Sequence, residues 1–183
     1  MPFSIRVARP DDVPGLQLLI PASVRGLSNG YYTPRQVESA LLHVFGVDSQ
    51  LIADGTYFVA ESEDALVGCG GWSKRNTLYG GDQTKGTEDP LLDPARDAAR
   101  IRAFFVHPDW ARLGMGRQLM YTCEAAARAD GFRRAELGAT LPGEPLYAAM
   151  GYAVVERFRL QFPDGEVFPL VKMSKALEGS QGV

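Results

Sequence analysis

The segment at residues 101–130 reads IRAFFVHPDWARLGMGRQLMYTCEAAARAD and contains the strand, loop and helix around which the predicted fold is built. An apolar run at 103–106 predicts a buried strand, and Pro108 ends that run because proline cannot continue a central strand. After Gly114 and Gly116, apolar residues recur at helical spacing and predict a long helix. They are Met115, Leu119, Cys123 and Ala126.

The glycine-containing loop has the features of a phosphate-binding loop. The first backbone N–H groups of a helix lack intrahelical partners, and the helix dipole adds partial positive charge there. Gly114 and Gly116 let the backbone approach an anion closely, and Arg112 and Arg117 add two positive charges. Nucleotide loops fit less well, because Arg117 replaces the P-loop lysine and Leu119 the third glycine of a dinucleotide-binding motif. On these residues alone, a tight turn without a ligand stays an alternative.

The pattern VHPDWARLGMGRQLM at 106–120 resembles the acetyl-CoA-binding motif of the GCN5-related N-acetyltransferase family. The family's core is Gln/Arg-x-x-Gly-x-Gly/Ala, whereas here Ala111 stands at the first position and Arg112 lies next to it. A second segment, EPLYAAMGY at 144–152, resembles the family's x-x-Phe/Leu-Tyr-x-x-x-Gly-Phe/Tyr element, whose tyrosine is Tyr147. The two motifs in this order are more specific than either alone.

The resemblance implies an N-acetyltransferase that moves an acetyl group from acetyl-CoA, its co-substrate, to an amine by direct attack in a ternary complex. The fold it implies is a single α/β domain at residues 1–176 with a mixed, mostly antiparallel twisted sheet flanked by helices. We expect a mobile tail at 177–183. The cofactor-binding residues implied are Phe105, Val106, Arg112, Leu113, Gly114, Met115, Gly116, Arg117 and Thr140.

Acyl transfer to an amine needs a neutral nucleophile, an oxyanion donor and a proton for the leaving thiolate. The resemblance implies Tyr147 as the general acid and a backbone N–H at 104–106 as the oxyanion donor. The strand at 99–106 has no glutamate, which is a common base in the family, so Glu61 on an earlier strand is our candidate base. His107 is a second candidate. The alternatives are that Tyr147 packs under the sheet, that Glu61 is a surface acid and that His107 has a structural or cofactor-side role.

The acceptor side gives weaker signals. Tyr31 and Tyr32, between two predicted helices, are candidate substrate contacts, and Trp72 at the end of a strand is a third. The long segment at 73–97 is acidic and would suit a cationic amine, with a solvated charged loop as the alternative. We expect a small-molecule amine as acceptor, and a protein N-terminus or lysine is the alternative. An acyl-CoA-binding sensor or regulatory domain without turnover is a rival from another class.

Composition excludes several other classes. A net charge of −3 argues against a nucleic-acid binder, and no apolar run reaches the roughly 20 residues that span a membrane. The only cysteines, Cys69 and Cys123, lie in predicted core segments, which suits a reducing cytoplasm without disulfides. Two cysteines and two histidines without ligand spacing predict no metal site. Exposed strand edges would allow a homodimer.

The alternation of apolar and polar residues, together with turn residues, predicts the remaining strands and helices. Expected strands lie at 4–8, 56–61, 66–72, 99–106, 134–140, 153–162 and 167–174. Thr33 and Pro34 predict the start of a helix as N-cap and first-turn proline, and Pro21 ends or kinks the helix before it. The glycines at 68, 70 and 71 thin one face of a strand, which we interpret as a bend of the strand in preference to a close approach.

Overall fold

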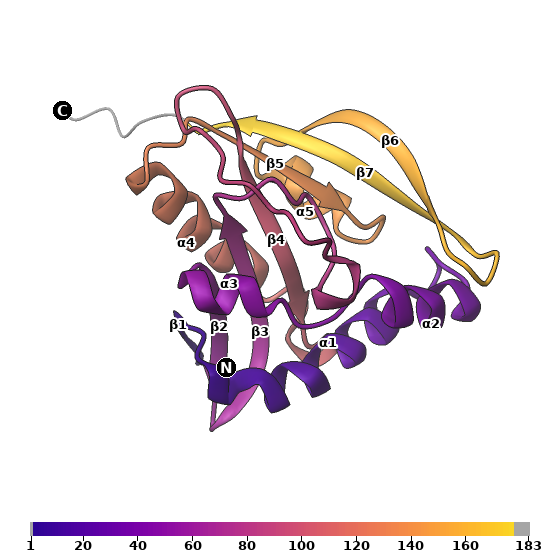
Figure 1. The fold of residues 1–183 in the computed structure, drawn as a ribbon. Coiled ribbons are helices and arrows are strands. Elements are labelled where there is room, and N and C mark those ends of the chain that lie inside the picture. The colour runs from indigo at the N-terminus through magenta and orange to yellow at the C-terminus, as the bar shows by residue number, and fades with distance from the viewer. Residues whose placement is uncertain (1, 178–183) are drawn as a thin grey trace.

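A seven-stranded twisted sheet in the order β1-β2-β3-β4-β5-β7-β6 runs through the molecule (Figure 1). The computed structural model describes residues 2–177. Every neighbouring pair of strands is antiparallel except β4 and β5, which are parallel. The predicted α/β class with a mixed, mostly antiparallel sheet is therefore confirmed. The strands are β1 (Ser4–Val7), β2 (Tyr57–Ser62), β3 (Ala65–Ser73), β4 (Ala99–Val106), β5 (Arg134–Ala139), β6 (Ala153–Gln161) and β7 (Val167–Ala176).

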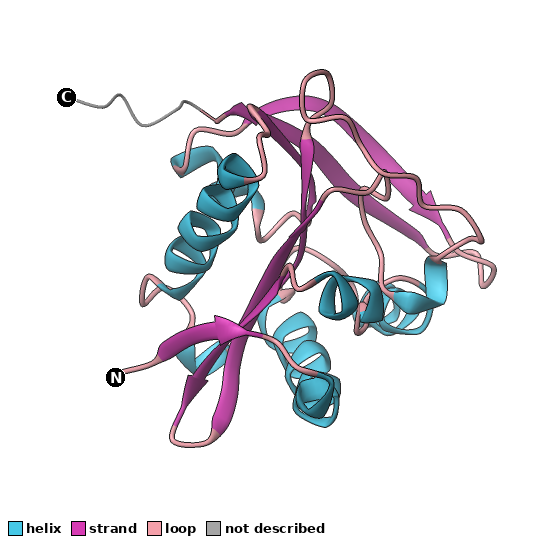
Figure 2. Cartoon of the chain, turned by 60° about the vertical axis from the view of Figure 1, so that its left-hand side comes forward, coloured by secondary structure: helices cyan, strands magenta, loops and turns pink. Residues whose placement is uncertain are grey.

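Helices cover both faces of the sheet (Figure 2). We call the face that carries α1, α2 and α3 the front, and the face that carries α4 and α5 the back. Front and back each bury their own clusters of apolar side chains against the strands between them. The helices are α1 (Val13–Leu27), α2 (Pro34–His43), α3 (Ser49–Asp54), α4 (Met115–Ala129) and α5 (Glu144–Ala149). Short 3-10 turns lie at Pro10–Asp12, Asp82–Thr84 and Pro108–Trp110.

Local sequence signals set most helix boundaries. The Thr33 side chain accepts a hydrogen bond from the Gln36 N–H, so the predicted cap of α2 is confirmed. Gly131, with φ of +96°, lies just past the end of α4, as predicted. Of the two alternatives at Pro21, an end of the helix is excluded, because α1 continues to Leu27.

The glycines of β3 are sites of close approach, so our interpretation of them as a simple bend is wrong. A Cβ on Gly68 would collide with the Met115 sulfur, and one on Gly70 would lie 2.7 Å from the Phe104 ring. Side chains larger than hydrogen would push β3 away from α4 and from β4. The glycines therefore let the central strands and the back helix pack closely together.

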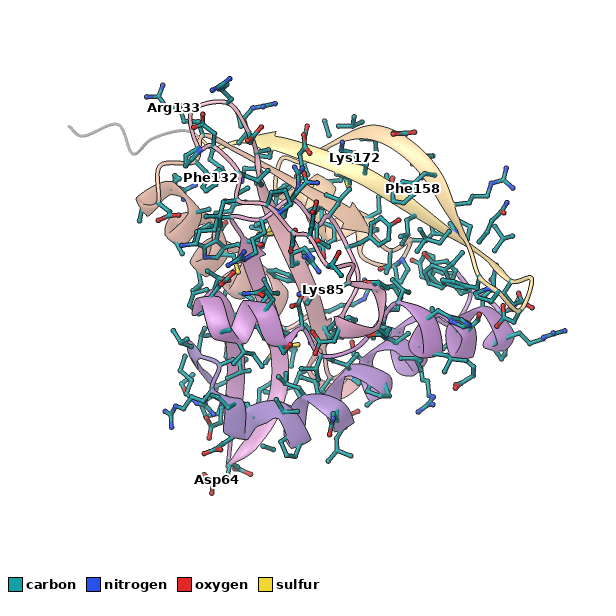
Figure 3. All side chains as sticks on the ribbon, in the orientation of Figure 1. Asp64, Lys85, Phe132, Arg133, Phe158 and Lys172 are labelled. Carbon is teal, nitrogen blue, oxygen red and sulfur yellow. The ribbon has the colours of Figure 1, made fainter. Side chains whose placement is uncertain are left out.

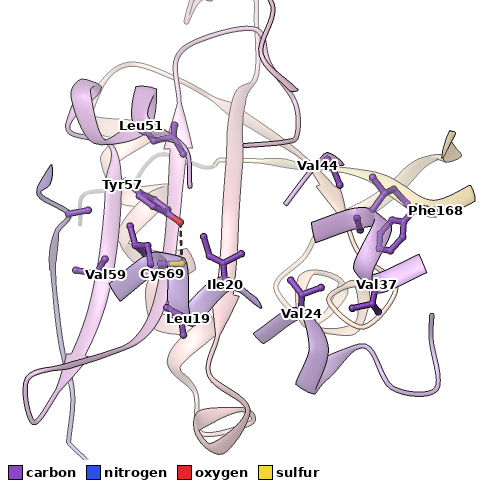
Figure 4. Close-up of a cluster of buried hydrophobic side chains, with 14 of the residues drawn as sticks. Leu19, Ile20, Val24, Val37, Val44, Leu51, Tyr57, Val59, Cys69 and Phe168 are labelled. Carbon is purple, nitrogen blue, oxygen red and sulfur yellow. Dashed lines mark hydrogen bonds between the residues drawn. The ribbon is translucent and has the colours of Figure 1, made fainter. Parts of the chain in front are cut away.

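The front cluster joins α1, α2 and α3 to β2, β3 and β7 (Figure 4). Tyr57 and Cys69 are fully buried in it, and the Tyr57 hydroxyl lies 3.1 Å from the Cys69 sulfur. At the other end of the chain, Leu177 is buried and its N–H donates to the Arg133 carbonyl. Leu177 is thus part of the folded domain, contrary to the expected tail, and the remainder of that tail, 178–183, lies outside the described residues.

Candidate functional site

The sheet opens between β4 and β5. Their parallel pairing covers only three positions and ends at Ile101 and Leu137, although both strands continue. A cavity of about 60 Å³ lies where the strands separate. Its walls come from both faces of the sheet, since Phe105 packs with the front cluster and Tyr147 with the back cluster. The lining residues are Val44, Phe45, Gly46, Leu78, Tyr79, Gly80, Gly81, Ile101, Arg102, Ala103, Phe104, Phe105, Leu137, Gly138, Thr140 and Tyr147.

A β-bulge in β4 borders this cavity. Cys69 pairs with Phe105 and Gly71 with Arg102, so two residues of β4, Ala103 and Phe104, face the single residue of β3 between them. Ala103 has φ of +57°, a strained value for a residue with a Cβ. A bulge takes a residue out of the hydrogen-bonded ladder, and this is where an uncommitted backbone donor is expected.

Buried donors hold the bulge in place. The Ala103 carbonyl accepts hydrogen bonds from the Tyr57 hydroxyl at 3.3 Å and from the Cys69 sulfur at 3.7 Å. Burial raises the pKa of Cys69 to about 12 and also raises the pKa of Tyr57 well above its ordinary value. Both groups therefore keep their protons at neutral pH and stay hydrogen-bond donors. The Tyr57 side chain of β2 and the Cys69 side chain of β3 thus hold the strained bulge in place.

Tyr147, the predicted general acid, lies on α5 with its ring in the back wall of the cavity. The ring is held edge-on between Phe104 and Tyr152, with centroid distances of 6.4 and 6.2 Å. Its hydroxyl makes no hydrogen bond within residues 2–177, so it is available to a ligand. Burial, together with the nearby Cys123, raises the pKa of Tyr147 above its ordinary value. The group is a protonated donor across the neutral pH range.

The N-terminus of α4 is built as the loop physics predicts. Gly114 is the N-cap, with φ of +86°, and no side chain caps the helix. Arg112 also has positive φ, of +61°, and is exposed, as is Arg117. Neither arginine forms an ion pair within the described part of the chain. The first turn thus has backbone N–H groups without a side-chain cap and two exposed arginines nearby, which are the features that the predicted anion site requires.

The other predicted cofactor residues lie around this loop and the cavity. Leu113 is exposed beside Gly114, whereas the Met115 side chain is buried against β3, so only its backbone faces the loop. Phe105 and Thr140 line the cavity. Val106 lies next to them, but its N–H donates to the Ser23 hydroxyl at 3.1 Å. Gly116 packs against α5, because a Cβ there would lie 2.9 Å from Leu146.

The structure does not bring the candidate bases to the cavity. Glu61 accepts a hydrogen bond from Arg6 at 2.7 Å, and both line a separate hollow beside α1. His107 lines that same hollow, and its Nδ1 accepts a hydrogen bond from the Asp109 N–H at 3.2 Å. The contacts of both residues are those of structural side chains.

The candidate substrate contacts also lie elsewhere. The Tyr32 hydroxyl donates to the Pro169 carbonyl at 2.6 Å and accepts from the Leu141 N–H at 2.9 Å, so it ties front loops to β7. Trp72 is buried and packs edge-on against Phe132 at 6.0 Å. Tyr31 is half exposed and does not line the cavity. Packing accounts for the positions of Tyr32 and Trp72, and neither lines the cavity, so the structure gives no support to their prediction as substrate contacts.

The long segment between β3 and β4 forms part of the cavity wall, through Leu78 and Tyr79. A buried cluster of charged side chains, which no sequence pattern predicted, binds this segment to β4 and to the start of α3. Arg102 on β4 donates to Asp48 at 2.8 Å and to the Thr77 and Gly80 carbonyls. Lys85 also donates to Asp48. Asp48 is completely buried.

The acids of this segment are not directed at the cavity. Asp82 accepts hydrogen bonds from the N–H and the hydroxyl of Ser49, and Asp89 accepts from the Thr77 N–H. Asp97 accepts from the Asp93 N–H at 2.7 Å. These carboxylates organise the segment itself, which supports the alternative of a structural, solvated loop over an acidic binding surface.

Comparison with known proteins decides the family. The model of the acetyltransferase (GNAT) family matches residues 25–152, which is more than half of the chain. The chain belongs to the acetyltransferase (GNAT) family. Acetyl transfer is the chemistry of this family.

Solved structures share the fold of this GNAT chain. A GCN5-related N-acetyltransferase from Rhodopseudomonas palustris is 22% identical, with 94% of each chain covered and a TM-score of 0.69. The PaiA N-acetyltransferase of Thermoplasma acidophilum, solved with coenzyme A, is 13% identical, with 96% and 99% covered and a TM-score of 0.64. YncA of Salmonella typhimurium, solved with acetyl-CoA, is 16% identical, with 98% and 96% covered and a TM-score of 0.63. No curated protein matches the chain.

Two searches within the described residues of the GNAT chain gave negative results. No helix in residues 2–177 is long and apolar enough to cross a membrane. In the same range, no group of three or more His, Cys, Asp or Glu residues is arranged to hold a metal ion.

Proposed function

We propose that this GNAT protein is an acetyl-CoA-dependent N-acetyltransferase that acts on a small-molecule amine by direct attack in a ternary complex. The observation that carries the proposal is the opening between β4 and β5, with the Tyr147 hydroxyl in its wall. The anion site at the start of α4 follows β4 directly in the chain. Two proteins of the same fold were solved with coenzyme A or acetyl-CoA, which supports the choice of acetyl donor.

The proposed roles follow from the positions of the groups. The backbone N–H groups of α4, with Arg112 and Arg117, would hold the phosphates of acetyl-CoA. Thr140 and the backbone of β4 at Phe105 and Val106 would line the path of its thiol arm. Tyr147 would give a proton to the sulfur that leaves, because its raised pKa keeps it protonated and its hydroxyl has no described partner.

The reaction needs no covalent intermediate on the protein. The amine nitrogen attacks the thioester carbonyl, and a backbone N–H at the β4 bulge stabilises the oxyanion. The carbon–sulfur bond then breaks. Cys123 is no nucleophile, because it is fully buried and burial raises its pKa well above its ordinary value. We also propose a cytoplasmic location, which the two free, buried cysteines support.

Isothermal calorimetry with acetyl-CoA tests the proposal, with ATP and NAD as control ligands. We expect binding of acetyl-CoA only, and about fivefold weaker binding in Arg117→Ala, since a charge-assisted contact at an exposed site contributes about 1 kcal/mol. Arg133→Ala is the matched control, because it removes the same charge beyond the other end of α4 (Figure 3). Absence of acetyl-CoA binding would refute the proposal. Binding without turnover of any amine would instead identify a sensor domain.

A further inference from the structure

We propose that the acceptor of this enzyme is a small arylamine, a primary amine attached directly to an aromatic ring. This inference rests on the proposed N-acetyltransferase function and names the substrate class of the same cavity. Two independent features of the front side of the cavity support it. One is the aromatic character of the wall, and the other is the lack of a proton acceptor among the described residues that form it.

Aromatic rings surround the front of the opening. Phe45 and Phe105 meet edge-on at a centroid distance of 5.9 Å. Tyr79, which also lines the cavity, lies over Gly138 of β5, where a Cβ would lie 3.6 Å from the Tyr79 Cβ, and its ring is 5.7 Å from Phe158. Ring pairs at 4.5–7 Å attract one another, so these walls suit a flat aromatic acceptor. Tyr79 thus lies within contact distance of β5 at Gly138, which also lines the cavity.

No carboxylate or imidazole is present among the described residues that line the cavity. The buried and half-buried carboxylates on the neighbouring elements are engaged, whereas Glu88 on the segment at 73–97 is exposed to solvent. Glu136 on β5 accepts from Arg100 at 2.7 Å and lies 3.6 Å from Lys172. Asp48 is held by Arg102 and Lys85 on the front, Asp89 accepts the Thr77 N–H, and Glu124 on the back is held by Tyr152 and Lys175. The site therefore has no free group that could take a proton from an ammonium ion.

An acceptor for such a site must arrive uncharged. An alkylamine with a pKa near 10.4 is less than about 0.1% neutral at pH 7. The nitrogen lone pair of an arylamine is delocalised into the ring, which makes the amine neutral at pH 7. An arylamine thus satisfies both the aromatic wall and the missing base.

The transfer balances without an enzymic base. The neutral nitrogen attacks the thioester carbonyl, a carbon–nitrogen bond forms and the carbon–sulfur bond breaks. The thiolate takes the proton of Tyr147, the new amide loses a proton to water, and water returns a proton to Tyr147. The products are the N-aryl acetamide and free coenzyme A.

Four amines separate aromaticity from basicity in a kcat/KM measurement by release of free thiol. They are 4-methoxyaniline (aromatic, weakly basic), benzylamine (aromatic, strongly basic), trifluoroethylamine (neither aromatic nor strongly basic) and propylamine (strongly basic only). We expect 4-methoxyaniline to exceed each other amine by about tenfold or more, with propylamine lowest. Between about pH 6.5 and 8.5 its kcat/KM should be flat, whereas that of benzylamine should rise about tenfold per pH unit with its neutral fraction.

Tyr79→Ala tests the wall itself. We expect kcat/KM for 4-methoxyaniline to fall about tenfold, the size of one aromatic pair, with less than about a twofold change for trifluoroethylamine. Tyr121→Ala is the matched control, because Tyr121 is an exposed tyrosine on the outer side of α4. An equal loss for both amines would show that Tyr79 is only structural and would overturn its role in recognition.

Other outcomes separate this inference from the function on which it rests. Preference for propylamine, or a pH-independent kcat/KM for benzylamine, would overturn the arylamine inference while leaving an N-acetyltransferase. Calorimetric binding of acetyl-CoA without turnover of any of the four amines would overturn it as well. Failure to bind acetyl-CoA would refute the proposed function itself.

Discussion

The buried charge cluster around Asp48 gives the strongest test of how the cavity wall is held. The Asp48 carboxylate is completely buried, and it caps α3 by accepting the N–H groups of Gln50 and Leu51. It also holds Arg102, whose side chain is nearly inaccessible to solvent. Asp48→Asn keeps an oxygen for the cap and the shape of the side chain but removes the charge that compensates Arg102.

The expected cost follows from this burial. Removing one partner of a buried ion pair costs about 3–5 kcal/mol, because the remaining charge is uncompensated. For a domain of this size, each kcal/mol lowers Tm by roughly 2–4 °C, so we expect Tm to fall by about 6–20 °C. Urea and thermal unfolding followed by circular dichroism measure both quantities. Asp82→Asn is the control, because that carboxylate is exposed and lies on the segment between β3 and β4, and its loss should cost about 0.5 kcal/mol.

A double-mutant cycle with Arg102→Met tests whether the uncompensated charge of Arg102 causes the loss of stability. If an uncompensated guanidinium causes the loss, the two substitutions should be coupled by about 2 kcal/mol, with the double variant more stable than their sum predicts. Additive effects within about 0.5 kcal/mol would refute the reasoning. So would a free energy of unfolding for Asp48→Asn within about 1 kcal/mol of the parent.

Three further predictions concern the reaction and its pH range. Tyr147→Phe should lower kcat about 10²-fold with an unchanged calorimetric affinity for acetyl-CoA, because it removes only the proton donor; an unchanged kcat would show that another group protonates the thiolate. Gly114→Val should weaken acetyl-CoA binding and cost about 1–2 kcal/mol of stability, since φ of +86° is unfavourable for a branched residue, and an intact calorimetric affinity would argue against the loop as the phosphate site. Burial raises the pKa values of Tyr57, Tyr147 and Tyr152 above their ordinary values. The folded state therefore keeps protons that the unfolded state releases, so urea unfolding should show stability falling as pH rises above about 10, and a flat profile would contradict this.

Signals that are local in the sequence predicted the fold well. The start of α2 follows from Thr33 and Pro34, and the loop before α4 follows from its glycines, because in both cases the residues act on their own backbone. The continuation of α1 past Pro21 was not predictable in this way, since tertiary packing offsets the loss of one helical hydrogen bond.

Features that depend on distant partners could not be predicted. Asp48 and Arg102 are 54 residues apart, and no pattern in either segment shows that they meet. Glu124 falls on a polar position of α4, yet it is buried because Lys175 and Tyr152 reach it. The candidate acids and aromatic residues of the site were predicted from their positions along the chain alone. Such positions do not distinguish Glu61, which pairs with Arg6, from an acid that lines the cavity.

The division of the cavity walls has a consequence for how this protein can be re-engineered. The groups proposed for chemistry belong to regular elements, whereas the front wall is contributed partly by one irregular segment between β3 and β4. That segment closes on itself through the Arg75–Leu91 bridge and the Leu92 N–H bond to the Lys74 carbonyl. We expect an exchange of residues 76–90 between these closed ends to change which acceptors are selected, provided that Lys85 and the backbone at Thr77 and Gly80 still hold the buried Asp48–Arg102 pair.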